Sequence, residues 1–562
     1  MLQQPNSHDL RLPRLLEATF VVVIGLELIA PYVTHTLGVD GRLQMKMILE
    51  YNHLISSGIF IPTWTPEGFY HFGATTFYFY PPLTFYLSAI IYRVGVQNPM
   101  VLFQTVCLLM TIASFFSARW LLWKLGSSQY RANLAAALYA FAPLRIAELY
   151  MRSSIATHIT YVFLPLICGA LIIIFQEAKS FSLKRALLLG LTCSLTALTD
   201  VPIAVMVAIG GALAAIVIWK KLKWTSTFEV LIGLGIAGAL AAYHFVSSVT
   251  AQSFSRLQDL HFPHRPSDIL VYFHLGPGTY YMALLYAAAG IIALAYVWLK
   301  WKKIAITHTE AMLGKVGLTI AAFILYLDLF PISSIVWNHF PPLDLVQFPW
   351  RFYPLLLLLG VLLVGLAQSP ILVRTARWVS TVWILGAILP IVLVVFSLHI
   401  FHPFERPLED ATEYLPIYFN PSIYANDDRT AVERALAPHK DDAPALGDLS
   451  SNENIQRATN APYLETYAVS FRAPQPIVFH RFYWPFWHLY IGDYEIPSHP
   501  DTLGRAVATL PAGTYTATWK LERTPLETAG LWISGVGWVG VLLFYGIGLV
   551  RKRVRKRVTS SP

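Results

Sequence analysis

The sequence predicts a polytopic α-helical membrane protein with a small β domain before its last span, and three observations support this fold class. Hydrophobic residues make up 56% of the 562 residues and charged residues only 13%, about half the charged share of a soluble domain. Apolar runs near the bilayer-spanning length of about 20 residues recur along the chain. From about residue 402 the composition becomes polar, proline-rich and strand-like.

The basic residues predict the number and orientation of the spans. More than half of the 41 Lys and Arg residues fall in seven short segments that alternate with the presumed outer loops, as the positive-inside rule requires. About twelve transmembrane helices fit, with both termini cytoplasmic and the first span an uncleaved anchor. The net charge of +9 is then explained by the basic residues that orient the spans in the membrane. We therefore expect no nucleic-acid partner. The spans are expected at 15–34, 100–122, 132–147, 158–176, 185–199, 201–219, 227–248, 279–299, 313–333, 352–368, 378–401 and 529–550.

The first outer loop, residues 35–99, is far longer than a connection between two spans needs. Long structured loops are usually functional. Within it, 81–95 is apolar but short, and the helix breaker Gln97-Asn98-Pro99 follows it. We expect this segment to lie on the outer membrane surface as a helix rather than to cross the bilayer.

The polar region predicts an extracytoplasmic, β-sandwich-like domain over 402–528. Alternating segments are typical of antiparallel strands, and we expect strands at 466–473, 476–483, 488–496, 505–510 and 514–521, with a turn at Gly492-Asp493. Residues 426–460 are expected to form a linker or loop with one short helix. The domain division is therefore 1–401 for the transmembrane domain, 402–528 for the β domain, and 529–562 for the last span and its basic tail.

Asp40 is the candidate catalytic acid because it lies just beyond the first apolar helix, at the start of the first outer loop. A carboxylate at the membrane–water boundary can accept a proton from a hydroxyl or hold a divalent cation beside a phosphate. A helix cap for the segment that follows is the alternative.

Aromatic residues of the same loop could stack on sugar rings, and Trp64 and Tyr80 are the candidates for glycan contact. Trp64 is the stronger of the two because it lies in the proline-bracketed turn Pro62-Thr63-Trp64-Thr65-Pro66. The alternative for most of these rings is an interfacial aromatic belt.

Basic residues on the expected outer side, Arg145 among them, are scarce and suit a lipid-linked phosphate. The candidates are Arg152, His158, Arg256 and Arg351. Snorkelling or pairing with nearby acids is the alternative. Gln44 and Asp200 are the polar candidates for contact with the substrate or glycan. Asp200 lies in the tight turn Leu198-Thr199-Asp200-Val201-Pro202, where a functional role and a capping role are equally compatible with the sequence.

In combination, these segments resemble the GT-C superfamily of integral membrane glycosyltransferases, and within it the bacterial YfhO-like, pyruvoyl-tetrahydropterin-synthase-related membrane family. The resemblance extends in order over nearly the whole chain. It is carried by GVDGRLQMK at 38–46, the loop 57–87, APLRIAELYMRSSI at 142–155, LTALTDVPIAV at 195–205, VQFPWRFYPLLLL at 346–358, TEYLP at 412–416 and the region 485–534.

The resemblance implies a GT-C-like fold in the bacterial inner membrane, with an extracytoplasmic active site. Its implied partners are a polyprenyl-phosphate-linked sugar, a lipid or glycan acceptor, and membrane lipids. Asp40 matches the family's first-loop acid, while Arg152 and Arg351 match basic positions.

The chain departs from the family pattern at three positions: Gln44 and Asp200 stand where histidine is frequent, and Thr157 where glutamate is frequent. These departures leave a metal, Mg²⁺ or Mn²⁺, as an open question.

We therefore expect an inverting sugar transfer with Asp40 as general base and arginines stabilising the departing polyprenyl phosphate. Two other classes stay open: a lipid-linked glycan flippase or transporter, and a non-catalytic cell-envelope assembly protein. The absence of an internal repeat weakens the transporter alternative.

Overall fold

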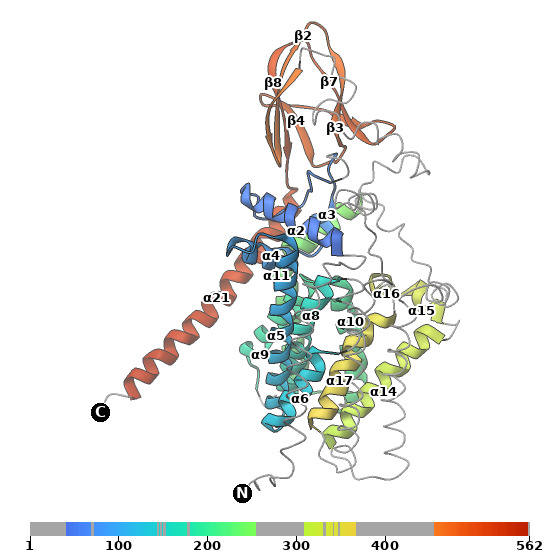
Figure 1. Cartoon of the computed structure of the whole chain (residues 1–562), viewed down its shortest axis with the longest axis vertical. Coiled ribbons are helices and arrows are strands. Elements are labelled where there is room, and N and C mark those ends of the chain that lie inside the picture. Colours follow the sequence, from blue (N-terminus) through green and yellow to red (C-terminus); the bar gives the residue numbers. More distant parts are fainter. Residues whose placement is uncertain are drawn as a thin grey trace. The chain divides into compact units, whose positions relative to one another are not determined.

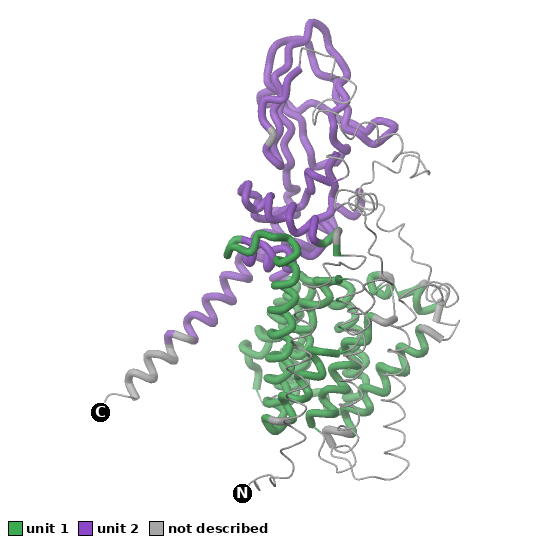
Figure 2. The backbone as a smooth tube through the Cα atoms, in the orientation of Figure 1, with its two compact units in different colours: residues 1–44, 93–238, 261–405 green, residues 45–92, 239–260, 406–562 purple. Residues whose placement is uncertain are grey.

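The structure is a computed structural model. It describes residues 41–68, 72–142, 145, 149, 153–176, 180–254, 308–329, 333–340, 342–346, 349–366 and 455–559. Its helices and strands are shown in Figure 1. By contact, the chain divides into two compact units, each built from three stretches of sequence (Figure 2). Unit 1 comprises 1–44, 93–238 and 261–405, and unit 2 comprises 45–92, 239–260 and 406–562.

Unit 1 is a bundle of helices that lie side by side (Figure 1). It contains a large cluster of buried apolar side chains, and small residues such as Ala132, Ala135 and Ala136 allow close packing between helices. Its helices are α5 (Pro99–Lys124), α6 (Gln129–Ala140), α8 (Ile155–Gln176), α9 (Leu183–Ala197), α10 (Val201–Ile218), the first half of α11 (Trp224–Gln252), α14 (His308–Leu329), α15 (Ser333–His339), α16 (Pro342–Val346) and α17 (Tyr353–Leu366), with the 3₁₀ turns η3 (Trp219–Lys221) and η5 (Pro349–Phe352).

Local sequence explains where these helices begin. The Asn98 side chain accepts hydrogen bonds from the backbone N–H groups of Met100 and Val101 at 3.0 and 3.1 Å, with Pro99 in the first helical position of α5. Asn is a preferred N-cap and Pro a preferred first residue. The breaker noted in the sequence is therefore the start signal of α5.

Five described helices are long and apolar enough to cross a membrane: α5, α8, α10 with η3, α11, and α21 up to Gly548. Each coincides with an expected span. Four further helices, α6, α9, α14 and α17, cover parts of four more expected spans. The expected spans 15–34, 279–299 and 378–401 lie outside the described residues, so the total of twelve stays a prediction.

In unit 2 the first outer loop folds around an aromatic cluster. It contains most of α2 (Gly41–Ser56), α3 (Thr76–Phe79) and α4 (Leu83–Arg93). The Tyr51 ring stacks on Phe85 at 5.1 Å and meets Phe77 edge-on at 4.9 Å. Helix α4 is 11 residues long, which confirms that 81–95 forms a helix too short to span. Tyr51, Phe77 and Tyr78 are buried, so these rings form a core rather than an interfacial belt.

The polar region forms a β-sandwich. One sheet has the order β1-β2-β8-β4-β5 and the other β3-β7-β6, with antiparallel pairing throughout. The strands are β1 (Ile455–Ala461), β2 (Leu464–Phe471), β3 (Gln475–Phe482), β4 (Trp487–Ile491), β5 (Tyr494–Ile496), β6 (Ser498–Pro500), β7 (Arg505–Leu510) and β8 (Gly513–Leu521).

The five expected strands are confirmed, and 488–496 divides at Gly492-Asp493 into β4 and β5, as the turn signal predicts. Gly492 has φ +58°, a conformation that favours glycine. Strand β6 was not predicted. The linker prediction is wrong for its last six residues, 455–460, because they belong to β1, the edge strand that pairs with β2. Residues 426–454 lie outside the described part of the chain.

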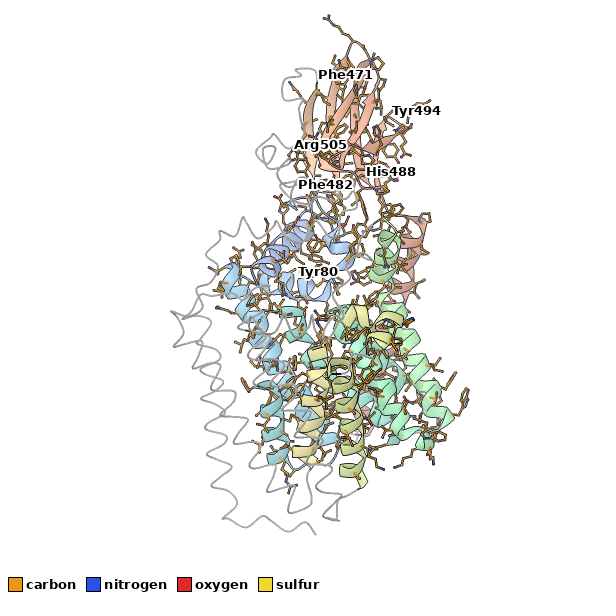
Figure 3. All side chains as sticks on the ribbon, turned by 90° about the vertical axis from the view of Figure 1, so that its right-hand side faces the viewer. Tyr80, Phe471, Phe482, His488, Tyr494 and Arg505 are labelled. Atoms are coloured by element: carbon orange, nitrogen blue, oxygen red, sulfur yellow. The ribbon has the colours of Figure 1, made fainter. Side chains whose placement is uncertain are left out.

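The aromatic run Phe482–Trp487 belongs to the core of the sandwich. Phe482 and Trp484 have no exposed surface, and Trp487 is 3% exposed. These rings therefore pack within the core of the β domain. By contrast, Tyr494 is 80% exposed and projects from the β4–β5 hairpin (Figure 3).

The last helix, α21 (Pro525–Thr559), begins with a capping box. The Glu527 carboxylate accepts from the Thr524 N–H at 2.7 Å, and the Thr524 hydroxyl accepts from the Glu527 N–H at 3.2 Å. This reciprocal pair satisfies two backbone donors at the helix start.

Helix α21 packs closely on the second half of α11 within unit 2. The Ser534 hydroxyl donates to the Ala239 carbonyl at 2.9 Å and accepts from the Tyr243 N–H at 2.9 Å. In a regular α-helix that N–H would donate to that carbonyl, so the hydroxyl is inserted into the hydrogen-bond ladder of α11. One turn earlier, a Cβ added at Gly530 would lie 3.0 Å from Val246 Cβ and 3.1 Å from the Ala242 carbonyl oxygen.

We expect Gly530→Ala to destabilise the protein by about 1–3 kcal/mol because the added methyl group overpacks the α11–α21 contact. The matched control is Gly535→Ala, since a Cβ at Gly535 meets nothing within 4 Å, and alanine favours helix by about 1 kcal/mol over glycine. Thermal unfolding of the two purified variants in detergent measures the difference. Equal midpoints would contradict the close approach.

Candidate functional site

A group of polar side chains lies in unit 1 around the start of α8, with Gln44 and Asp200 partly buried and the other members buried. We call this group the polar seam. Its members are Gln44 of α2, Gln104, Thr111 and Ser114 of α5, Arg145, Ser154, Thr157 and His158 at the start of α8, and Asp200 at the start of α10.

Gln44 joins the first turn of α2 to the start of α8. Its Oε1 accepts a hydrogen bond from the Ile155 N–H at 2.9 Å. The first N–H groups of a helix have no partner within the helix, so Gln44 caps α8 from another element. Gln44 lies four residues after Asp40 in the sequence.

Asp200 caps α10 and also contacts α8. Its Oδ1 accepts from the Ile203 N–H at 3.1 Å, while its Oδ2 accepts from the Thr157 hydroxyl at 2.9 Å. Thr157 Oγ1 in turn accepts from the Ser154 hydroxyl at 3.0 Å. The capping alternative is therefore observed, together with a hydroxyl chain that leads from Asp200 to Ser154.

Arg145 and His158 form the buried end of the seam. Arg145 is 1% exposed and His158 is 3% exposed. Arg145 Nη1 donates to Ser114 Oγ at 2.5 Å, and Arg145 Nη2 lies 3.1 Å from His158 Nε2. The guanidinium also lies over the Tyr161 ring, 4.7 Å from its centroid, a cation–π contact that stabilises a desolvated cation.

Sequence reasoning missed the side of the seam formed by α5. Gln104, Cys107, Thr111 and Ser114 are spaced by three, four and three residues in an otherwise apolar segment. This spacing puts them on one helix face, and all four are buried in the structure. The signal was present in the sequence, and Arg145 had been assigned to the outer surface rather than to the interior of the bundle.

The structure places the other candidate residues from the sequence analysis in different parts of the chain's fold, or does not describe them. Arg351 lies partly buried in η5, which contacts α10 and α14. Asp40, Arg152 and Arg256 lie outside the described residues, so the expected meeting of Asp40 with Arg152 and Arg351 stays a prediction. Of the other candidates, Gln44, His158 and Asp200 belong to unit 1 and are members of the polar seam.

Trp64 and Tyr80 belong to unit 2. Tyr80 is partly buried at the end of α3 (Figure 3). Trp64 is 2% exposed, and its ring lies 6.5 Å from that of Trp484 and 6.0 Å from that of Trp487. Because its ring faces are covered, Trp64 is a core residue, and we no longer assign it to glycan stacking.

The backbone at Trp64 is held by one hydroxyl. Tyr463 Oη accepts from the Thr63 and Trp64 N–H groups at 2.6 and 2.8 Å and donates to the Trp64 carbonyl at 3.0 Å. Burial raises the pKa of Tyr463 to about 12. The phenol therefore keeps its proton at neutral pH and can donate and accept at once.

We expect Trp64→Ala to destabilise unit 2 by about 3–5 kcal/mol because it leaves a large cavity in the core. Tyr494→Ala, which removes an exposed ring, should change stability by no more than about 0.5 kcal/mol. Denaturant unfolding followed by tryptophan fluorescence measures both. An undiminished stability for Trp64→Ala would return Trp64 to the candidates for sugar stacking.

The described residues do not fit a divalent cation by themselves. In the part of the chain that the structure describes, no group of three or more His, Cys, Asp or Glu side chains lies together. The Gln44 Oε1 and Thr157 Oγ1 atoms, the other oxygens considered as ligands, are already hydrogen-bonded to protein groups. No step of the reaction is therefore assigned to a metal.

No protein-family model matches the chain, and no curated protein matches it. Several solved structures resemble parts of it. The mycobacterial arabinofuranosyltransferase AftD is 15% identical over 91% of this chain and 40% of that chain, with a TM-score of 0.43. Its R1389S mutant is 17% identical over 68% and 27%, with a TM-score of 0.39. The Archaeoglobus fulgidus oligosaccharyltransferase, in complex with Zn and sulfate, is 14% identical over 74% and 56%, with a TM-score of 0.35.

This chain spans less than two thirds of the length of each of these proteins. All three are glycosyltransferases by name, and each is at most 17% identical to this chain.

Proposed function

We propose that this chain is a GT-C-type membrane glycosyltransferase, related to the YfhO-like family. It transfers a sugar from a polyprenyl-phosphate-linked donor to a lipid or glycan acceptor. The reaction takes place at the extracytoplasmic face of a bacterial inner membrane, and Asp40 is the general base.

The observation that supports the proposal is the polar seam, most of whose members are buried within a helix bundle. Polar and ionisable groups within membrane helices are costly and mark functional sites. Gln44 ties the first turn of α2 to the seam, and Asp40 immediately precedes Gly41, the first residue of that helix. Asp40 is therefore the sequence neighbour of the helix that contributes Gln44 to the seam.

The chemistry follows from the leaving group. Asp40 accepts the proton of an acceptor hydroxyl as that oxygen attacks the anomeric carbon, and the bond from that carbon to the phosphate oxygen breaks. The phosphate leaves with the electron pair of the broken bond, so the configuration at the anomeric carbon is inverted. Arg152 and Arg351 stabilise its charge, since guanidinium groups bind phosphate in a bidentate manner.

The test presents the full-length protein in nanodiscs with a panel of polyprenyl-phosphate-linked sugars and unlabelled membrane glycolipid as acceptor. We expect glycosylated product with at least one donor, and release of the matching polyprenyl phosphate in equal amount. Absence of product with every donor, from a protein that unfolds cooperatively, would contradict the enzyme assignment.

The location of the reaction is tested separately by cysteine accessibility in intact cells. An impermeant thiol reagent should label Gly38→Cys, which precedes Asp40, and should not label Ser561→Cys in the C-terminal tail. Labelling of both positions, or of the tail alone, would contradict the proposal that residue 38 is extracytoplasmic and the tail cytoplasmic.

A further inference from the structure

We propose that the start of α8 is a subsite that binds sugar hydroxyl groups and does not bind the donor phosphate. The inference rests on the proposed glycosyl transfer and names the substrate chemistry that this part of unit 1 recognises. It replaces the phosphate-binding role expected for His158. Three described side chains carry it: Ser154, His158 and Gln104.

Ser154 presents an acceptor because the carboxylate of Asp200 sets the direction of the hydroxyl chain. An ionised carboxylate only accepts hydrogen bonds, so Thr157 must donate to Asp200 Oδ2 across their 2.9 Å contact. The Thr157 proton is then used, and Ser154 must donate to Thr157 across 3.0 Å. What Ser154 Oγ still offers is its lone pairs, which suit the O–H group of a ligand.

His158 presents a donor because Arg145 sets its tautomer. Guanidinium groups carry donors and no acceptor. Arg145 Nη2 lies 3.1 Å from His158 Nε2, so an N–H at Nε2 would oppose a donor of a permanent cation. Charge-assisted hydrogen bonds are about twice as strong as neutral ones. The Thr111 hydroxyl, 2.9 Å from Nε2, can also donate to this nitrogen. Together these donors outweigh the alternative bond from Nε2 to the Cys107 carbonyl at 3.1 Å. The proton therefore resides on Nδ1.

The Nδ1 atom is buried, and no acceptor for it is found among the residues that the structure describes. His158 as a whole is 97% buried, by its 3% exposure. A buried N–H without an acceptor is costly, and a functional partner is one of the few accepted explanations for such a group.

Gln104 adds both a donor and an acceptor. It is 7% exposed, and neither its Oε1 nor its Nε2 has a hydrogen-bond partner within the described part of the chain. It lies one turn before Cys107 on the buried face of α5, and the Cys107 carbonyl is the group near His158 Nε2. An amide can accept from one sugar hydroxyl and donate to the next.

These groups together match a polyol and not a phosphate. A phosphate offers only acceptors and binds donors and cations, whereas Ser154 presents lone pairs. The cation of the seam is engaged with the protein, because Arg145 binds Ser114, the Ala140 carbonyl and His158. A hydroxyl group both donates and accepts, as this mixed set requires.

The test compares two ligands of the full-length protein in nanodiscs: the polyprenyl-phosphate-linked sugar that the wild type uses, or binds best, and bare polyprenyl phosphate. The variants are Gln104→Met and Thr157→Val, each close to the native side chain in size. Thr157→Ser serves as the rescue because it keeps the hydroxyl. The matched control is Thr192→Val on α9, whose buried hydroxyl bonds only carbonyls of its own helix, Leu188 and Leu189.

We expect Gln104→Met and Thr157→Val to weaken binding of the sugar-bearing donor by about 5- to 10-fold, the effect of losing one neutral hydrogen bond. For the same two variants, the affinity for bare polyprenyl phosphate should stay within about two-fold of the wild-type value. For Thr157→Ser and Thr192→Val, the affinities for both ligands should stay within this range. If these two variants raise the KM of the acceptor and leave donor binding unchanged, the subsite binds hydroxyl groups of the acceptor glycan.

Equal weakening of both ligands would overturn the inference, because the seam would then bind the phosphate. Unchanged binding and unchanged KM values for both substrates would overturn it as well. Failure of the proposed function is a separate result: the wild type would form no product with any donor, while the difference in binding between the two ligands could still be measured.

Discussion

Replacing Asp40 by asparagine is expected to lower the rate of sugar transfer by about 10²–10⁴-fold, the contribution typical of a positioned general base. At about 1.36 kcal/mol for each factor of ten, this is about 3–5 kcal/mol of transition-state stabilisation. Asparagine has the size of aspartate but cannot accept the proton of the attacking hydroxyl. The loss should therefore fall on kcat, with donor binding little changed.

The measurement is product formation from the polyprenyl-phosphate-linked donor, with Asp493→Asn as the matched control. Asp493 is an exposed aspartate in the β4–β5 turn, so the control makes the same chemical change away from the polar seam. Wild-type activity should decline as acid protonates the base, and the residual activity of Asp40→Asn should lack this decline. Equal turnover by the wild type and Asp40→Asn would exclude Asp40 as the base and favour a non-catalytic assembly role.

Replacing Glu229 by glutamine is expected to destabilise unit 1 by about 3–5 kcal/mol, as is typical when one partner of a buried ion pair is removed. The Glu229 side chain has no exposed surface, and its Oε2 accepts from Arg185 Nε at 2.8 Å. Its Oε1 accepts from Arg185 Nη2 at 2.6 Å and from the Ser182 N–H at 2.8 Å. The pair joins the start of α9 to the first turns of α11.

Two further variants are compared with Glu229→Gln, and the stability of each is measured by unfolding in detergent. The double variant Arg185→Met/Glu229→Met should lose less than Glu229→Gln, because it leaves no unpaired buried charge. Glu522→Gln, which breaks the exposed Lys520–Glu522 pair at 2.7 Å, should cost at most about 1 kcal/mol. A Glu229→Gln variant as mild as Glu522→Gln would show that the buried pair does not hold these helices together.

The local elements of the fold could be predicted from the sequence because their causes are local. The apolar runs at 99–124 and 155–176 form helices of spanning length. The short apolar segment at 83–93 forms a helix that is not long enough to span. Alternation at 505–510 and 514–521 predicts β7 and β8, and Gly492-Asp493 predicts the turn between β4 and β5. The strand β1 was missed because Ile455–Ala461 is polar and lies at the edge of the sheet. Few of its side chains are buried, so apolar and polar residues hardly alternate along it.

The candidate site was predictable only in part. Gln44, His158 and Asp200 were chosen from sequence, and the structure brings them into one seam. Their contacts differ from those expected: Asp200 caps a helix, Gln44 caps another, and His158 is hydrogen-bonded within the bundle. Arg145 was read as an outer basic residue, because charge alone does not reveal whether a long side chain turns toward water or toward Ser114 and Tyr161.

The sequence by itself determined that the chain is a membrane protein with a β domain before its last helix, since hydropathy, helix caps and strand alternation depend on neighbours within a few residues. Tertiary structure decided which polar groups meet and which aromatic rings are covered. The Trp64 ring packs against Trp484 and Trp487, and its backbone is held by Tyr463, 399 positions away along the chain. Gln44 reached Ile155, 111 positions away. Such contacts depend on long-range packing, which no short pattern in the sequence specifies.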